Sequence, residues 1–366
     1  TGAGFQEDLC IGNPGDITAN VTVNYMFNQG QPLKRDFRVG PKARVTVDVN
    51  QVVGPDREVS ARVDSDVPVI AERPMYFEYR PAGEGPDGGG EVWEGGHDVV
   101  GASAPGVSWY FAEGTTREGF EEWVTVLNPQ ERQALLTFTY MLEGDQPLVE
   151  NDMVPAHTRK TYRVSDHVGP GRDVSLLLES DVGVVAERPI YFRYRGLSGW
   201  DWRDGHCVAG VPAPSRDWHF AEGTTRAGFE EWLCLQNPNE EEITVDALYL
   251  PGEGQGGPVN STYRVPPGER LTVSVNLEAG AEKDVSASLH SEDAFIAERP
   301  LYFSYMGPWG RGWDGGHDVM GAQSPELTWY FAEGYTGADF EEWLCLENPD
   351  DERAQITVTY YPEAGE

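Results

Sequence analysis

The chain has 366 residues, of which 61 are acidic and 27 are Lys or Arg, so its formal net charge at pH 7 is −34. Such a negative field repels phosphate backbones and anionic lipid surfaces, which excludes nucleic acid and membrane surfaces as expected partners. No stretch approaches about 18 consecutive apolar residues and the first residues do not resemble a secretion leader, so we expect neither membrane insertion nor a signal peptide here.

The sequence repeats itself with a period close to 110 residues. A marker phenylalanine falls at positions 5, 120, 229 and 340, so successive spacings are 115, 109 and 111 residues. A period this long is typical of an independently folding domain and exceeds the roughly 20 to 50 residues of a solenoid repeat. We therefore expect four β-sandwich repeats: residues 1–104, with the first strand missing, residues 105–213, residues 214–324, and a partial repeat over residues 325–366.

Within each repeat the predicted elements follow one order. After the marker phenylalanine comes a strand-like run that ends at Asn-Pro, as at 233–238, and this dipeptide is a turn signal because proline presets φ. The next run alternates apolar and polar residues, as at Val21, Val23 and Tyr25, which is the period of a half-buried strand. A Gly-rich turn, a short strand and two more alternating strands complete the hairpins.

The last strand of each repeat contains Ala-Glu-Arg-Pro, at 71–74, 186–189 and 297–300. Proline cannot donate to a ladder, so we expect an edge or a bulge there. Neighbouring Glu and Arg face opposite sides of a strand, so one of them must face inward and need a partner. The recurring arginines of a nearby strand are the expected partners of the glutamates, namely Arg44, Arg159 and Arg270.

With the Trp-Tyr-Phe-Ala run included, each repeat offers about seven short strands and no amphipathic helix. This count, joined by Gly and Pro turns, predicts an all-β chain of tandem immunoglobulin-like antiparallel β-sandwich domains. The joints are short and contain proline, so the domains are expected to form a semi-rigid rod.

Four short sequence motifs resemble those of a known family. They are Trp-Tyr-Phe-Ala-Glu-Gly (329–334), Phe-Glu-Glu-Trp-Leu-Cys-Leu-Gln-Asn-Pro (229–238), Ala-Glu-Arg-Pro-Met-Tyr-Phe (71–77) and Gly-Gly-His-Asp-Val (95–99). Together they resemble a tandem repeat of secreted and cell-surface proteins of actinobacteria and related thermophiles, and the similarity spans the whole chain. The resemblance implies an extracellular or cell-surface location and a stalk or array role, and it attaches no catalytic residues.

Tryptophans are concentrated around the joints between repeats. All eleven lie between the end of one Ala-Glu-Arg-Pro strand and the start of the next Asn-Pro strand. Large aromatic side chains that pack across a junction bury much apolar area and would stiffen the array. Aromatic platforms could instead stack on sugar rings, which makes a polysaccharide-binding or adhesion module the alternative function. The rings that decide between the two are those of Trp109, Trp123, Trp218, Trp232, Trp329 and Trp343.

Each junction also gathers an imidazole and several carboxylates. Such groups could hold a divalent cation such as calcium. However, no tight ligand spacing such as an EF-hand loop is present, so we prefer turn capping and pairing with arginine, and we expect no cofactor. The candidate metal ligands are His97, Asp98, Glu113, His317, Asp318 and Glu333.

The four cysteines allow two interpretations. Cys10, Cys234 and Cys345 occupy one equivalent position, where the second repeat has Thr125, so they cannot pair within a domain. They are expected to be small buried hydrophobic residues. The alternative is a disulfide between Cys207 and Cys234 across the junction of the second and third repeats.

Nothing in the sequence marks a reaction centre. There is no Gly-x-Ser-x-Gly elbow, and nothing places a second carboxylate opposite the Glu-Arg pairs, as glycoside hydrolysis requires. We therefore expect a non-enzymatic, structural stalk or filament component whose partners are other copies of itself or neighbouring repeats of a longer chain. A further expectation is that residues 329–366 add their strands to the open N-terminal repeat of another copy.

Overall fold

The computed structural model describes every residue except 3, 82–91, 308–309, 339 and 363–366. Its strands pair antiparallel in several sheets, which confirms the predicted all-β class. The immunoglobulin-like topology stays a prediction. Among the described residues there are also one-turn helices that the sequence did not lead us to expect. No described helix is long and apolar enough to cross a membrane.

The strands fall into three sets, which we call units 1, 2 and 3. Unit 2 has two layers, with strand orders β12-β11-β14-β9 and β13-β10-β14-β15, and the 22-residue strand β14 runs through both. Its elements are β9 (Gly106–Phe111), β10 (Phe120–Asn128), β11 (Ala134–Leu142), β12 (Leu148–Val154), β13 (Thr158–Arg163), α2 (Ser165–Val168), β14 (Val174–Arg195) and β15 (Asp201–Ala209).

Unit 3 repeats this arrangement, with the 22-residue strand β21 shared between its two layers. Its elements are β16 (Ser215–Phe220), β17 (Phe229–Gln236), β18 (Ile243–Pro251), β19 (Val259–Val265), β20 (Arg270–Ser274), α3 (Val275–Glu278), β21 (Val285–Met306) and β22 (Gly312–Met320).

Unit 1 has the same order, but one described layer contains the three strands β3-β2-β5, where the other units have four. Its elements are β1 (Phe5–Asn13), β2 (Ala19–Phe27), β3 (Leu33–Val39), β4 (Ala43–Asp48), α1 (Val49–Val53), β5 (Val59–Ser65), β6 (Ile70–Glu72), β7 (Met75–Tyr79) and β8 (Trp93–His97).

A separate hydrophobic core fills each unit, and the alternating strands supply it. In β11, the side chains of Leu136, Phe138 and Tyr140 are buried while the intervening ones are more exposed, as period-two patterning predicts. The Ala-Glu-Arg-Pro strand is central and not an edge. Its ladder with β10 is interrupted opposite Arg188 and Pro189, and in unit 1 the same position separates β6 from β7.

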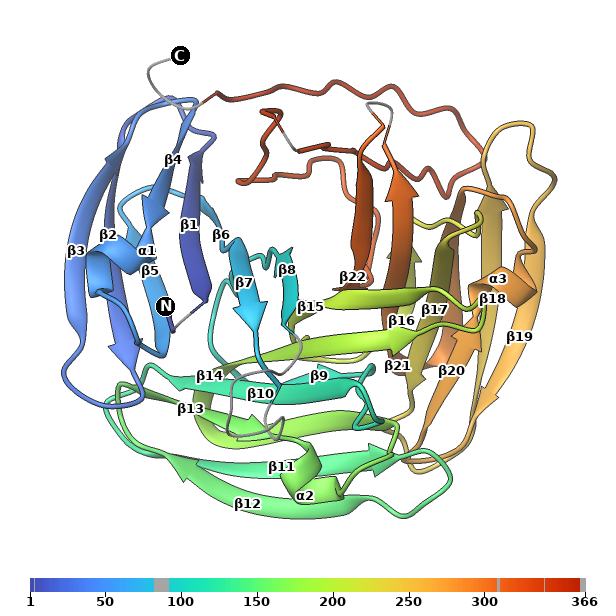
Figure 1. Cartoon of the computed structure of the whole chain (residues 1–366), viewed down its shortest axis with the longest axis horizontal. Coiled ribbons are helices and arrows are strands. Elements are labelled where there is room, and N and C mark those ends of the chain that lie inside the picture. Colours follow the sequence, from blue (N-terminus) through green and yellow to red (C-terminus); the bar gives the residue numbers. More distant parts are fainter. Residues whose placement is uncertain (3, 82–91, 308–309, 339, 363–366) are drawn as a thin grey trace.

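The units close around a common centre and do not extend as the expected rod (Figure 1). Strands β8, β15 and β22 lie side by side there. The Asp204 carboxylate of β15 accepts hydrogen bonds from the backbone N–H of Gly96 at 3.2 Å and of Gly316 at 3.0 Å. This close approach depends on glycine, because a Cβ at Gly95 or Gly315 would lie within 2.3 Å of that carboxylate. The strands therefore pack against one another where a rod would separate them.

Residues 325–338 and 340–362, which we call the C-terminal segment, cross from unit 3 back to unit 1 and contain no described strand (Figure 1). Part of the segment lies against unit 1 of its own chain, where the backbone N–H of Glu333 donates to Glu72 at 2.5 Å. Addition of this segment to another copy stays a prediction.

Candidate functional site at the unit junctions

Aromatic clusters join consecutive units. Tyr191 of unit 2 packs edge-on against Phe77 of unit 1, with ring centroids 5.0 Å apart. Tyr302 of unit 3 meets Phe192 of unit 2 in the same way at 5.1 Å. Edge-to-face rings in a buried interface add to the stabilisation from apolar burial alone. The two junctions are therefore built on one pattern.

Beside the aromatic cluster of units 2 and 3, the carboxyl group of Glu298 in unit 3 binds the link between β9 and β10 of unit 2. The backbone N–H groups of Ala112 and Glu113 each donate to it at 3.0 Å, and Glu298 itself is fully buried. Two backbone donors that would otherwise lose water find an acceptor in this buried carboxyl group. Glu298 thus fixes the path of the link after β9.

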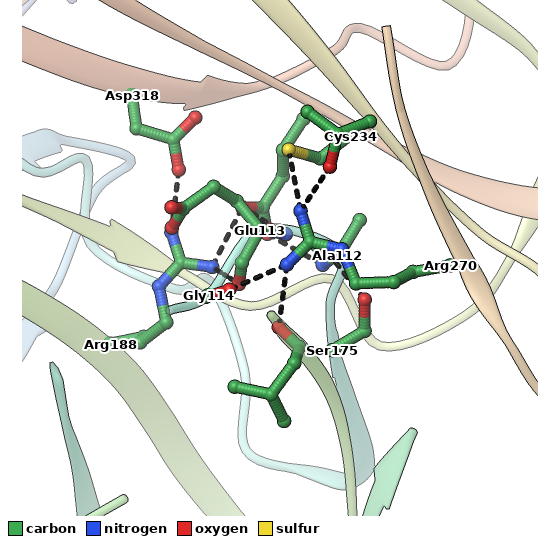
Figure 2. Close-up of polar contacts among 11 residues, drawn as sticks. Ala112, Glu113, Gly114, Ser175, Arg188, Cys234, Arg270 and Asp318 are labelled. Atoms are coloured by element: carbon green, nitrogen blue, oxygen red, sulfur yellow. Dashed lines mark hydrogen bonds and ion pairs between the residues drawn. The ribbon is translucent and has the colours of Figure 1, made fainter. Parts of the chain in front are cut away.

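One guanidinium sits among three carboxylates at this junction (Figure 2). Arg188 of β14 lies 2.8 Å from Glu298, 2.5 Å from Asp318 of β22 and 3.0 Å from Glu113, and all four side chains are buried. Burial raises the pKa of Glu113 to about 7, although Arg188 opposes the shift. Burial acts to raise the pKa of Asp318, but Arg188, His206 and the hydrogen bond with Glu298 together lower it below its usual value. The cluster is a paired ion group inside the protein.

Arg270 of β20 does not bind Glu298, so the predicted pairing of these recurring arginines with the glutamates is wrong here. Its Nη1 donates to the carbonyl of Gly114 at 2.5 Å, and its Nη2 donates to the thiol of Cys234 at 3.1 Å (Figure 2). The glutamate is satisfied by backbone N–H groups and by an arginine of the preceding unit, and a pattern within one repeat gives no sign of either.

The contact with this arginine explains why one repeat has threonine at a position where the others have cysteine. Arg159 donates to the hydroxyl of Thr125 at 3.1 Å in unit 2, as Arg270 donates to Cys234 in unit 3. A small side chain with a weak or strong acceptor fits beneath the guanidinium in both units. Both Cys207 and Cys234 are free thiols, so the disulfide hypothesis is wrong. The Cys207 thiol instead faces Arg73, at 3.8 Å.

The structure brings some of the candidate metal ligands together. Glu113 and Asp318 join Glu298 in one compact buried group, but Arg188 already contacts all three carboxylates. A cation there would have to displace a guanidinium that the geometry holds in place. Calcium binding stays a prediction, and this group does not favour it.

The other candidates lie apart from that group. His97 is enclosed, and burial lowers its pKa to about 3. His317 lies 3.4 Å from Glu222. Asp98 and Glu333 lie at the face of unit 1, where the Asp98 side chain is exposed.

The six tryptophans that distinguish the two functions divide into two buried, two half-buried and two exposed side chains. Trp109 and Trp218 are 2% and 0% exposed, and their indole N–H groups donate to backbone carbonyls within their own units. Trp123 and Trp232 are half-buried at the junction clusters. By contrast, Trp329 and Trp343 of the C-terminal segment are exposed.

No protein-family model and no curated protein matches the chain. Among solved structures, Thermotoga maritima 1070 is 18% identical, with a TM-score of 0.26 over 29% of this chain and 94% of its own. The Anabaena sensory rhodopsin transducer is 24% identical, with a TM-score of 0.22 over 24% and 99%. A bacterial ice-binding adhesin is 12% identical, with a TM-score of 0.12 over 84% and 87%. Similarities this weak carry no argument about function, and the resemblance to a surface repeat family stays a prediction.

Three residues of the junctions were not singled out from the sequence as contacts between units. Arg188 and Glu298 belong to the Ala-Glu-Arg-Pro strands, whose second buried face becomes evident only when another unit covers it. Asp204 stands where the other repeats have Gly95 and Gly315, and this substitution was the one available signal.

Proposed function

We propose that the chain is a structural, non-catalytic protein of the cell surface, in which firmly joined β units form part of a stalk or filament. The observation that carries this proposal is the junction of units 2 and 3. There, the ionisable side chains that could do chemistry are buried and bonded to one another, with Arg188 among Glu113, Glu298 and Asp318. Groups held in this way fix the angle between units and are closed to a substrate.

The surface supports the same proposal. A depression of about 430 Å³ over β2 and β3 has one carboxylate, Asp36, in its lining, whereas glycoside hydrolysis needs a pair. The net charge of −34 opposes the lateral collapse of neighbouring stalks or filaments.

Polysaccharide binding is the alternative function, and it requires exposed, evenly spaced aromatic rings. Trp109 and Trp218 occupy equivalent positions and are buried, which favours the structural proposal. Most of the exposed rings belong to the C-terminal segment, for which a different explanation follows below; Trp200 of unit 2 and Tyr76 of unit 1 are 45% and 38% exposed.

Electron microscopy of the purified chain, with and without EDTA, tests the structural proposal. We expect compact particles, or fibres built from them, that do not change when divalent cations are removed. Calorimetric titration with soluble cell-wall polysaccharides is expected to give no saturable heat. Saturable binding at one site per unit would favour the adhesion alternative, and release of sugar products would make the chain an enzyme.

A further inference from the structure

The C-terminal segment docks on unit 1 in the way that the link after β9 docks on unit 3. Glu333 donates its backbone N–H to Glu72 at 2.5 Å, as Glu113 does to Glu298 at 3.0 Å. The arginines follow the same rule, because Arg44 donates to the Gly334 carbonyl at 2.6 Å and Arg270 to the Gly114 carbonyl at 2.5 Å.

The segment also continues the pattern at both neighbouring units. The Glu341 carboxylate lies against Gly307 of unit 3, as that of Glu230 lies against Gly196 of unit 2. On the other side, Phe340 meets Tyr76 of unit 1 with ring planes at 83°, the angle that Phe5 makes with Tyr191. The segment therefore lies in a fourth place of the ring, between unit 3 and unit 1.

The two faces that border this place are complementary in charge. Elsewhere, an arginine of one unit binds a glutamate of the next, with Arg73 to Glu187 and Arg188 to Glu298 both at 2.8 Å. Arg299 of unit 3 pairs with Glu222 of its own unit. In the described part of the chain, Glu72 of unit 1 makes no ion pair. One face thus offers an arginine and the other a glutamate.

Aromatic side chains that border this fourth place are exposed, whereas their described counterparts at the other junctions are buried. Tyr76 is 38% exposed, whereas Tyr191 and Tyr302 are 8% and 5% exposed. Trp329 is 56% exposed, whereas Trp109 and Trp218 are enclosed. Covering aromatic side chains of this size stabilises an interface, because it removes a large apolar area from water. The exposed face therefore favours an occupant of the same repeat type.

We propose that the remaining strands of a fourth repeat, joined to the C-terminal segment and equivalent to β12–β15, occupy this place and close a ring of four units. Their arginine, the counterpart of Arg188, would lie among Glu72, Asp98 and Glu333, and their glutamate would bind Arg299. The inference concerns assembly and does not depend on the proposed role at the cell surface.

Cys345 provides the test. It is exposed, whereas Cys10, Cys207 and Cys234 are buried. Glu366 corresponds to Gln255, so the full chain can be extended after Glu366 with its own residues 256–324, which contain no cysteine. In the native chain we expect maleimide to label one thiol. In the extended chain, labelling of Cys345 should slow by about tenfold or more, because reaction then requires local opening.

The matched control carries alanine at the appended counterparts of Glu298 and Arg299, and it should restore fast labelling of Cys345. Unchanged labelling in the extended chain would overturn the proposal. So would protection of Cys345 in the native chain that grows with protein concentration, since a second copy would then fill the place. Light scattering must show that the extended chain is monomeric.

Discussion

At the scale of single residues, Arg188 joins two units through three buried carboxylates, Glu113, Glu298 and Asp318. Replacing it with methionine keeps much of the volume and leaves the carboxylates without their cation. Loss of one partner from a buried ion group costs about 3–5 kcal/mol. We expect Arg188→Met to lower the free energy of unfolding by that amount in urea titrations monitored by circular dichroism.

Arg132 gives the matched control for this prediction. It pairs with Asp181 at 2.7 Å, but its side chain is exposed. Arg132→Ala should therefore change the free energy of unfolding by no more than about 1 kcal/mol. Equal effects of the two substitutions would show that the junction group contributes nothing beyond a surface pair.

His206 gives the junction a measurable dependence on pH. Burial lowers its pKa from 6.5 to about 3, and neither ring nitrogen has a hydrogen-bond partner among the described residues. Because the folded pKa is depressed, its stabilising contribution is complete above pH 6.5 and is lost as the pH falls from there toward 3. Each proton taken up only by the unfolded chain costs about 1.4 kcal/mol per pH unit.

The variant His206→Phe should remove that one-proton slope. The measurement is the free energy of unfolding of both proteins at several pH values between 4 and 7. Raised carboxyl pKa values elsewhere, such as about 7 for Asp204, act in the opposite sense and are common to both proteins. Parallel curves for the two proteins would contradict the prediction.

At the scale of elements, the Asn-Pro turns hold three strands. The Asn128 side-chain amide donates to the carbonyls of Arg132, Val154 and Pro155 at 2.9–3.1 Å, and its oxygen accepts the backbone N–H of Gln130. An aspartate there would turn a carboxylate toward three carbonyl oxygens. We expect Asn128→Asp to cost about 2–3 kcal/mol or more in thermal and urea unfolding.

The equivalent asparagine of the C-terminal segment is the control. Asn348 is exposed and donates to a single described carbonyl, that of Glu352. Asn348→Asp should therefore shift stability by no more than about 0.5 kcal/mol. A large effect there would mean that the segment already has the packing of a complete unit.

The motif Trp-Tyr-Phe-Ala-Glu-Gly begins in strand β9 and recurs in the C-terminal segment, where its surroundings differ. The Trp109 indole donates to the Val184 carbonyl at 2.8 Å inside the core, whereas Trp329 is exposed. We expect Trp109→Phe to cost about 1–3 kcal/mol, because it leaves a buried carbonyl unpaired, and Trp329→Phe to be close to neutral. Equal stabilities of the two variants, measured by calorimetry, would contradict the assignment.

These elements show how far sequence patterns reach. Alternation in β11 follows from one face meeting a core, so Leu136, Phe138 and Tyr140 could be placed from the sequence. The Asn-Pro turn was predicted from the φ preference of proline. The hydrogen bond from the Asn128 side chain to the Val154 carbonyl joins residues 26 apart, and no local sequence pattern indicates it. The partner of Glu298 was misplaced for the same reason, since Arg188 lies 110 residues away in another unit.

At the scale of the whole molecule, short joints were expected to give a rod because proline-bearing links are stiff. Stiffness alone does not fix a direction. The direction is set by contacts that recur at each junction, the Phe–Tyr pair and the Arg–Glu pair, with Phe77–Tyr191 and Arg73–Glu187 at one junction and their counterparts at the next. Repeating one contact with one rotation closes a ring or winds a helix, and here the C-terminal segment returns to unit 1.

Small-angle scattering separates a ring from a rod in solution. A compact fold of 366 residues has a radius of gyration of about 21 Å, whereas three domains of about 110 residues in line would give about 30 Å. We expect a value near the lower figure for the native chain. Combining Arg188→Met with Tyr302→Ala, which removes the ion group and the aromatic contact between units 2 and 3, should open that junction and raise the radius. A native value near 30 Å, unchanged in the double variant, would mean that these junction contacts do not set the shape.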